Sequence, residues 1–114
     1  MKRFFIIAPR LLKFITANFA TAMALYPFIL FKSEEAQQNQ VLVNHERIHL
    51  RQQIEMLVIP FYIWYGIEYL IRCIQFRSHY VAYRHISFER EAYQNEKKTN
   101  YLADRKFWNF LKYL

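Results

Sequence analysis

The stretch His45-Glu46-Arg47-Ile48-His49 is the part of this sequence that decides how the chain folds and where its chemistry lies. Residues four positions apart lie on the same face of a helix, one turn apart, so the two imidazoles can reach a single metal ion. Glu46 lies about one residue's rotation away, where it would contact a water molecule on that ion. The stretch therefore predicts a helix that carries part of a metal site.

Apolar and polar positions continue the helical spacing on both sides of this stretch. From Val41 onward an inward face recurs every three or four residues and consists of Leu42, His45, His49, Gln52 and Met56. Asn39 is predicted to cap the start of the helix, because an Asn side chain there accepts from a backbone N–H of the first turn. The polar segment Ser33 to Gln40 is predicted to be a solvated loop.

A second polar face follows a predicted connection at Ser78 to Arg84. At helical spacing it contains two carboxylates and one imidazole, within the set His85, Phe88, Glu89, Ala92, Tyr93 and Glu96. Burying such a face is costly unless its polar groups have partners, and a metal ion is one such partner. Glu89 and Glu91 are both candidates for a third ligand. Glu89 is preferred, because Glu91 lies roughly on the opposite side of the helix.

Residues 20 to 98 resemble a known family in two motifs. A His-Glu-x-x-His helix, followed one helix later by the Glu-x-x-Ala stretch that begins at Glu89, is similar to the gluzincin metallopeptidases. The likeness is closest to their minimal forms and to the catalytic cores of the membrane CAAX-prenyl-protease and β-lactam-sensor peptidases. It implies that His45, His49 and Glu89 bind Zn2+, and that the extended stretch Ala20 to Phe31 aligns a peptide substrate.

One position departs from that family pattern. Where the membrane families usually have an Asp that holds a ligand histidine, this chain has Tyr93. Partners of this kind fix the orientation of the imidazole and tune the metal. The sequence therefore predicts metal binding more firmly than it predicts activity.

The predicted reaction is hydrolysis of a peptide bond by a zinc-bound water. Glu46 would take the proton of that water and return it to the leaving nitrogen. His85 and Tyr93, or Tyr83, are candidate donors to the oxyanion that forms. The alternative is a non-catalytic membrane-associated or interaction protein that retains a structural metal site.

Length and composition limit the fold. The chain has 114 residues with 9 Tyr, 11 Phe and one Gly, which suits packed helices in one domain. We expect a mainly α (α+β) fold of four to five helices, with a short strand or hairpin before the helix of the two histidines. Residues 1–19 form a basic, apolar N-terminal segment, residues 20–98 the core and residues 99–114 a final helix. The lone Cys73 excludes an internal disulfide and a cysteine-based zinc cluster.

Two long apolar runs bear on membrane association. Phe14 to Phe31 has no formal charge and the length of a span, but its polar residues favour helix to about Phe19 and strand after it. Met56 to Ile71 is predicted to be a buried or interfacial helix with Pro60 near its start. If this run crossed a bilayer, the histidines and Glu89 would lie on opposite sides. Its Tyr and Trp residues are predicted to be core, with an interfacial aromatic belt as the alternative.

The net charge of +7 favours acidic partners. No recognisable nucleic-acid-binding motif accompanies it, so no nucleic acid is expected. The expected partners are a peptide or protein substrate and a membrane surface. The expected location is cytoplasmic, peripheral at the inner membrane, with a single span over residues 14–31 left open as the alternative.

Overall fold

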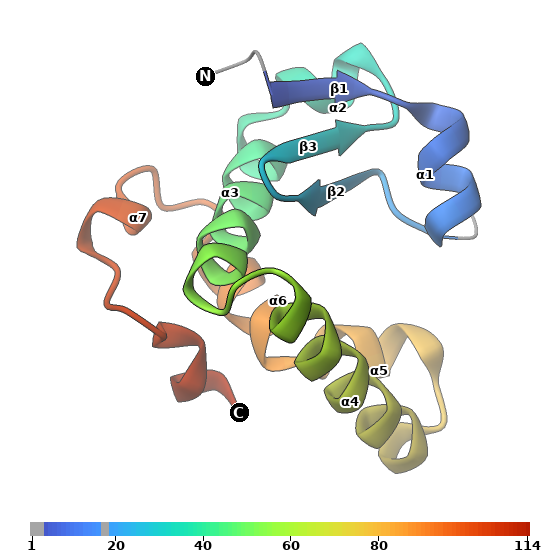
Figure 1. The fold of residues 1–114 in the computed structure, drawn as a ribbon, viewed down its shortest axis with the longest axis vertical. Coiled ribbons are helices and arrows are strands. Elements are labelled where there is room, and N and C mark those ends of the chain that lie inside the picture. Colours follow the sequence, from blue (N-terminus) through green and yellow to red (C-terminus); the bar gives the residue numbers. More distant parts are fainter. Residues whose placement is uncertain (1–3, 17–18) are drawn as a thin grey trace.

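A computed structural model describes residues 4–16 and 19–114 of the chain. Its described part is mainly helical with one small sheet, which confirms the predicted fold class (Figure 1). The strands are β1 (Phe5–Ile7), β2 (Ala22–Leu25) and β3 (Phe28–Phe31). The helices are α1 (Pro9–Thr16), α2 (Glu34–Gln38), α3 (Gln40–Glu55), α4 (Ile59–Phe76), α5 (His79–His85), α6 (Ser87–Asn95), α7 (Tyr101–Asp104) and the 3-10 helix η2 (Asn109–Tyr113).

The three strands form a mixed sheet in the order β1-β3-β2. β1 runs parallel to β3, whereas β2 and β3 are antiparallel and joined through Tyr26 and Pro27. The extended stretch predicted before the histidine helix is thus a hairpin, and β2 is an edge strand. The strand β1 was not predicted, because three apolar residues are too few to show a period of two.

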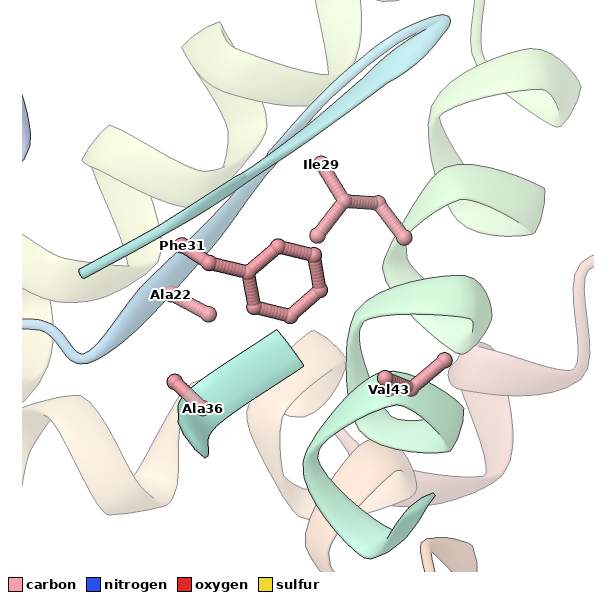
Figure 2. Close-up of a cluster of buried hydrophobic side chains, with 5 residues drawn as sticks. All are labelled: Ala22, Ile29, Phe31, Ala36 and Val43. Atoms are coloured by element: carbon pink, nitrogen blue, oxygen red, sulfur yellow. The ribbon is translucent and has the colours of Figure 1, made fainter. Parts of the chain in front are cut away.

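Helix α3 lies against the sheet and shares a core with it. Side chains on one face of β2 and β3 meet side chains of α2 and α3 in a buried cluster, shown in Figure 2, that consists of Ala22, Ile29, Phe31, Ala36 and Val43. The Phe31 ring points from β3 into the space between the strands and the two helices. This packing holds β2 alongside the helix that carries the two histidines.

A second, aromatic core joins the later helices. It consists of Met56, Phe61, Ile86, Phe88 and Phe110. The Phe88 ring lies 4.4 Å from the ring of Phe61 on α4 and 4.5 Å from that of Phe110 on η2, centroid to centroid. Because Phe88 precedes Glu89, this packing fixes the position of α6 and of the carboxylate that it carries.

Four segments differ from the sequence-based expectation. The predicted loop Ser33 to Gln40 contains α2, and the predicted connection Ser78 to Arg84 contains α5; Ser33 and Ser78 cap these short helices through their hydroxyl groups. The predicted final helix is instead α7 and η2, separated by a stretch in which Arg105 has an extended backbone. The helix expected to reach about Phe19 ends at Thr16, and residues 17 and 18 lie outside the described part.

Helix α4 is the helix predicted over Met56 to Ile71, with Pro60 in its first turn. Within the described residues, no single helix is long and apolar enough to span a membrane. Helices α3 and α4 reach that length and hydropathy only when taken together, and a 113° bend separates them. The bend occurs at Leu57 and Val58, where φ is 62° and 49°. The buried residues of α4 are Phe61 and Glu68, so much of this helix faces outward.

Candidate metal centre

Helix α3 presents both histidines on one buried face. The helix begins at Gln40, and its predicted cap is confirmed, since the Asn39 side chain accepts from the Leu42 backbone N–H at 3.2 Å. The imidazole centroids of His45 and His49 lie 4.9 Å apart, and the two residues are 4% and 6% exposed. The four-residue spacing therefore has the consequence predicted for it.

The carboxylate of Glu89 lies between the two imidazoles. Its Oε1 atom is 3.1 Å from Nε2 of His45 and 3.0 Å from Nε2 of His49, and the group is buried and could hold a metal ion. In a tetrahedral zinc site with bonds of about 2.0–2.2 Å, ligand atoms lie roughly 3.4 Å apart. The three predicted ligands thus come together at a spacing close to that of a metal site.

The hydrogen bonds of Gln52 determine the tautomer of His49. The side-chain nitrogen of Gln52 donates to Glu91 at 2.9 Å and to the backbone carbonyl of Phe88 at 3.2 Å. Its oxygen is therefore the acceptor for Nδ1 of His49, at 2.8 Å. We assign the proton of a neutral His49 to Nδ1, which leaves the lone pair of Nε2 directed at Glu89.

Glu96 has the same effect on His45. Its carboxylate accepts from Nδ1 of His45 at 2.8 Å, so Nε2 again carries the lone pair. Asn44 holds this end of α6 against α3, because its side-chain nitrogen donates to the backbone carbonyls of Glu96 at 2.7 Å and Lys98 at 3.1 Å. Glu96 thus makes the contact to a ligand histidine that the family pattern assigns to the position of Tyr93.

With neutral imidazoles, two nitrogen lone pairs and a carboxylate oxygen point at one another. Such an arrangement is favourable only if positive charge, as protons or a metal ion, lies among the three atoms. Burial opposes protonation of His49, but the Glu89 carboxylate outweighs burial and raises the pKa of His49 to about 9. For Glu89, burial acts to raise the pKa, yet His49 and His45 hold that pKa well below its usual range.

Glu46 lies beside this group without being one of its ligand candidates. It is 5% exposed and lines the wall of a cavity of about 460 Å³ together with His49 and Glu89. Burial raises the pKa of Glu46 above its usual value, although His49 and His45 partly offset the effect. A buried carboxylate with a raised pKa, next to three convergent ligand atoms, is suited to accept and return a proton.

The cavity is lined mostly by apolar and aromatic side chains. They come from the segment before β2, from β2 itself and from α4. Gly66 of α4 is part of the lining, and a Cβ atom added to it would meet no heavy atom within 4 Å. Because any larger side chain at this position would project into open space, Gly66 widens the cavity on the α4 side.

The structure places the predicted oxyanion donors differently. The Tyr93 ring packs against the His45 ring, with centroids 4.4 Å apart, and its hydroxyl lies 2.8 Å from that of Tyr83, which lines the cavity. His85 instead contacts α4: its ring packs on Phe76, and its Nδ1 donates to the Val81 carbonyl at 2.8 Å. These contacts place His85 away from the group formed by His45, His49 and Glu89.

Sequence reasoning missed the contact of Tyr65 with a ligand. Its hydroxyl donates to Oε2 of Glu89 at 2.7 Å, which leaves Oε1 directed at the histidines. The aromatic run of α4 gave no signal that separated Tyr65 from core residues. Glu96 did carry a signal, because it lies seven residues after Glu89 on the same predicted face.

Glu91, the rival ligand candidate, has other partners. Both of its oxygens accept from the guanidinium of Arg105, at 2.5 and 3.1 Å, and Tyr101 donates to it at 2.5 Å. Its link to the candidate metal-binding group of His45, His49 and Glu89 is through Gln52, which donates to Glu91 and accepts from His49. The structure therefore places Glu89, and not Glu91, against the histidines.

No protein-family model matches this chain, and neither the curated proteins nor the solved structures give a match.

Replacing Glu96 with Gln is expected to weaken metal binding at this group about 10–100-fold, the usual effect of changing a partner of a ligand histidine. Gln keeps the shape of Glu but provides a weaker, neutral acceptor for Nδ1 of His45. The measurement is a competition titration against a chromophoric chelator. Lys97→Gln at the adjacent exposed position is the matched control, and an equal loss in both variants would contradict the assigned contact.

Proposed function

We propose that this protein is a zinc-dependent metallopeptidase that hydrolyses peptide bonds. The observation that supports the proposal is the convergence of His45, His49 and Glu89, with both imidazole tautomers set by their outer hydrogen bonds, beside the buried carboxylate of Glu46. Two imidazoles and one carboxylate are a donor set that zinc accepts in catalytic sites.

When bound, zinc would polarise a substrate carbonyl and lower the pKa of water. Glu46 holds the proton released from the attacking water and delivers it to the leaving nitrogen. It is suited to this role because it faces the cavity, whereas the carboxylate of Glu89 is directed at His45 and His49. Tyr65 orients Glu89. Tyr83 lines the cavity and is a candidate donor to the developing oxyanion.

The surroundings of the site favour an extended peptide as substrate. Ala22 on the edge strand β2 lines both the main cavity and a second one of about 320 Å³ on the His45 side. An extended peptide can pair with an edge strand. Gln53 and Tyr62 already donate to the Ala24 carbonyl, at 2.9 and 2.6 Å, so pairing would use the part of the edge that precedes Ala24.

Metal content tests the site directly. The purified protein is expected to contain about one equivalent of zinc by elemental analysis, and His45→Ala and Glu89→Ala are each expected to remove it, because two protein ligands hold zinc far more weakly than three. His79→Ala, at an exposed histidine, is the matched control and is expected to retain the metal. Full zinc occupancy in both ligand variants would exclude this site.

Zinc binding at pH 7 is expected to release protons, since His49 has a pKa of about 9 without metal and must be neutral to act as a ligand. Affinity should accordingly rise with pH up to about 9 and level off above it. Calorimetric titrations in two buffers of different ionisation enthalpy give the number of protons released. A value near zero at pH 7 would contradict the protonated state assigned to metal-free His49.

A further inference from the structure

The outward face of α4 is apolar throughout. Six of its residues are each between 53% and 80% exposed, namely Ile59, Ile63, Ile67, Leu70, Ile71 and Ile74. At 3.6 residues per turn these six and the exposed Pro60 cover an arc of about 120° with no polar side chain, over about 22 Å of helix. We call these seven residues the α4 apolar face. Exposed apolar residues are common singly, but a contiguous face of this length marks a binding surface.

The two edges of this face differ. On one edge the Trp64 indole donates to Glu68 at 2.7 Å. A Trp between apolar and polar surroundings is typical of a helix at a membrane interface. On the other edge is Gly66, which neighbours Ile63 and Leu70 on the helix surface and lines the cavity beside the metal-binding group.

The exposed charge of α4 lies at its C-terminal cap and is basic. Between residues 54 and 88 the acidic residues are Glu55 and Glu68. Glu55 is paired with Arg105, and Glu68 is buried, where it accepts from the backbone N–H of Ser87. The basic residue of α4, Arg72, is half-buried, and the one at its C-terminal cap, Arg77, is exposed. The surroundings are therefore positive, as is the whole chain at +7.

We propose that the α4 apolar face binds the surface of an anionic phospholipid bilayer, with α4 lying in the membrane plane. The apolar face enters the acyl boundary, while Arg77 at the C-terminal cap contacts lipid phosphates. The proposal does not depend on the metal site, but it places the cavity wall at Gly66 next to the lipid surface.

Co-sedimentation with vesicles tests this inference. The protein is expected to bind vesicles of equal parts phosphatidylglycerol and phosphatidylcholine, and to bind phosphatidylcholine alone much more weakly. Changing Ile63, Ile67 and Ile74 together to Gln is expected to weaken binding more than tenfold, because each loses buried apolar area. Arg77→Gln is expected to weaken binding to anionic vesicles about fivefold.

The matched control changes three exposed apolar residues of the C-terminal segment, Phe107, Leu111 and Leu114, to Gln. It is expected to bind vesicles as the unchanged chain does, and circular dichroism shows whether each variant is folded. Equal binding by the folded α4 triple variant, or equal losses in the control, would overturn the proposal. So would a lipid-independent dimer that the α4 substitutions convert to monomer in light scattering, since the face would then join two copies.

Discussion

Replacing Glu46 with Gln is expected to lower kcat/KM for peptide hydrolysis by about 10²–10⁴-fold while zinc content stays at one equivalent. Gln has nearly the shape of Glu but cannot accept the proton of the attacking water. The folded state should tolerate the change, because it removes a buried carboxylate whose charged form burial disfavours. Activity is measured on an unstructured protein and on a quenched fluorescent peptide library, and metal by elemental analysis.

The pH profile gives a second readout of the same residue. Glu46 acts in its ionised form, so kcat/KM should fall on acidification as that form is lost. In the metal-free chain burial raises the pKa of Glu46 above its usual value. Glu35→Gln, at an exposed position of α2, is the control and should change neither quantity. A Glu46→Gln protein that cleaves as fast as the unchanged chain would refute the mechanism. Zinc binding without any hydrolysis would favour the non-catalytic alternative.

Replacing Arg105 with Met is expected to lower the free energy of unfolding by about 3–5 kcal/mol, the usual cost of removing one partner from a buried charge network. The Arg105 side chain lies between Glu55 and Glu91, at 2.5 Å from an oxygen of each. Glu91 is fully buried, so without the guanidinium its charge lacks a cation. The measurement is denaturant-induced unfolding at pH 7.

The network offers its own control. Glu91→Gln combined with Arg105→Met removes the buried charge as well as its partner, so the double variant is expected to regain part of the lost stability. Lys106→Met, at the exposed neighbouring position, should change the free energy of unfolding by less than about 0.5 kcal/mol. Stability of Arg105→Met within that same range would show that the network does not support the fold.

The ligands could be predicted from the sequence because they depend on local geometry. His45 and His49 share a face of one helix through their spacing alone, and Glu89 could be separated from Glu91 by its side of the next helix. The residues that hold them could not be predicted in this way. Gln52 lies one turn after His49 on α3, but its orientation depends on its bonds to Phe88 and Glu91 of α6. Glu96 contacts His45 because α6 packs along α3, and its place on the predicted face did not identify His45 as its partner.

The errors in the C-terminal segment have the same origin. Its apolar spacing predicts a continuous helix, but the buried pairing of Arg105 and the contacts of Trp108 with Glu55 end α7 and hold the chain in another path. Tertiary contacts thus outweigh local propensity there. Short helices such as α2 and α5 were missed because one or two turns give too few positions to show a period.

The pairing of Arg105 with Glu91 has a consequence for the order of events during protein synthesis. Every candidate metal ligand precedes residue 90, yet the cation that neutralises Glu91, and through Gln52 supports His49, comes from residue 105. On the ribosome, a nascent chain that has exposed both ligand helices still lacks that cation. We therefore expect tight metal uptake only after the segment around Arg105 has emerged and docked.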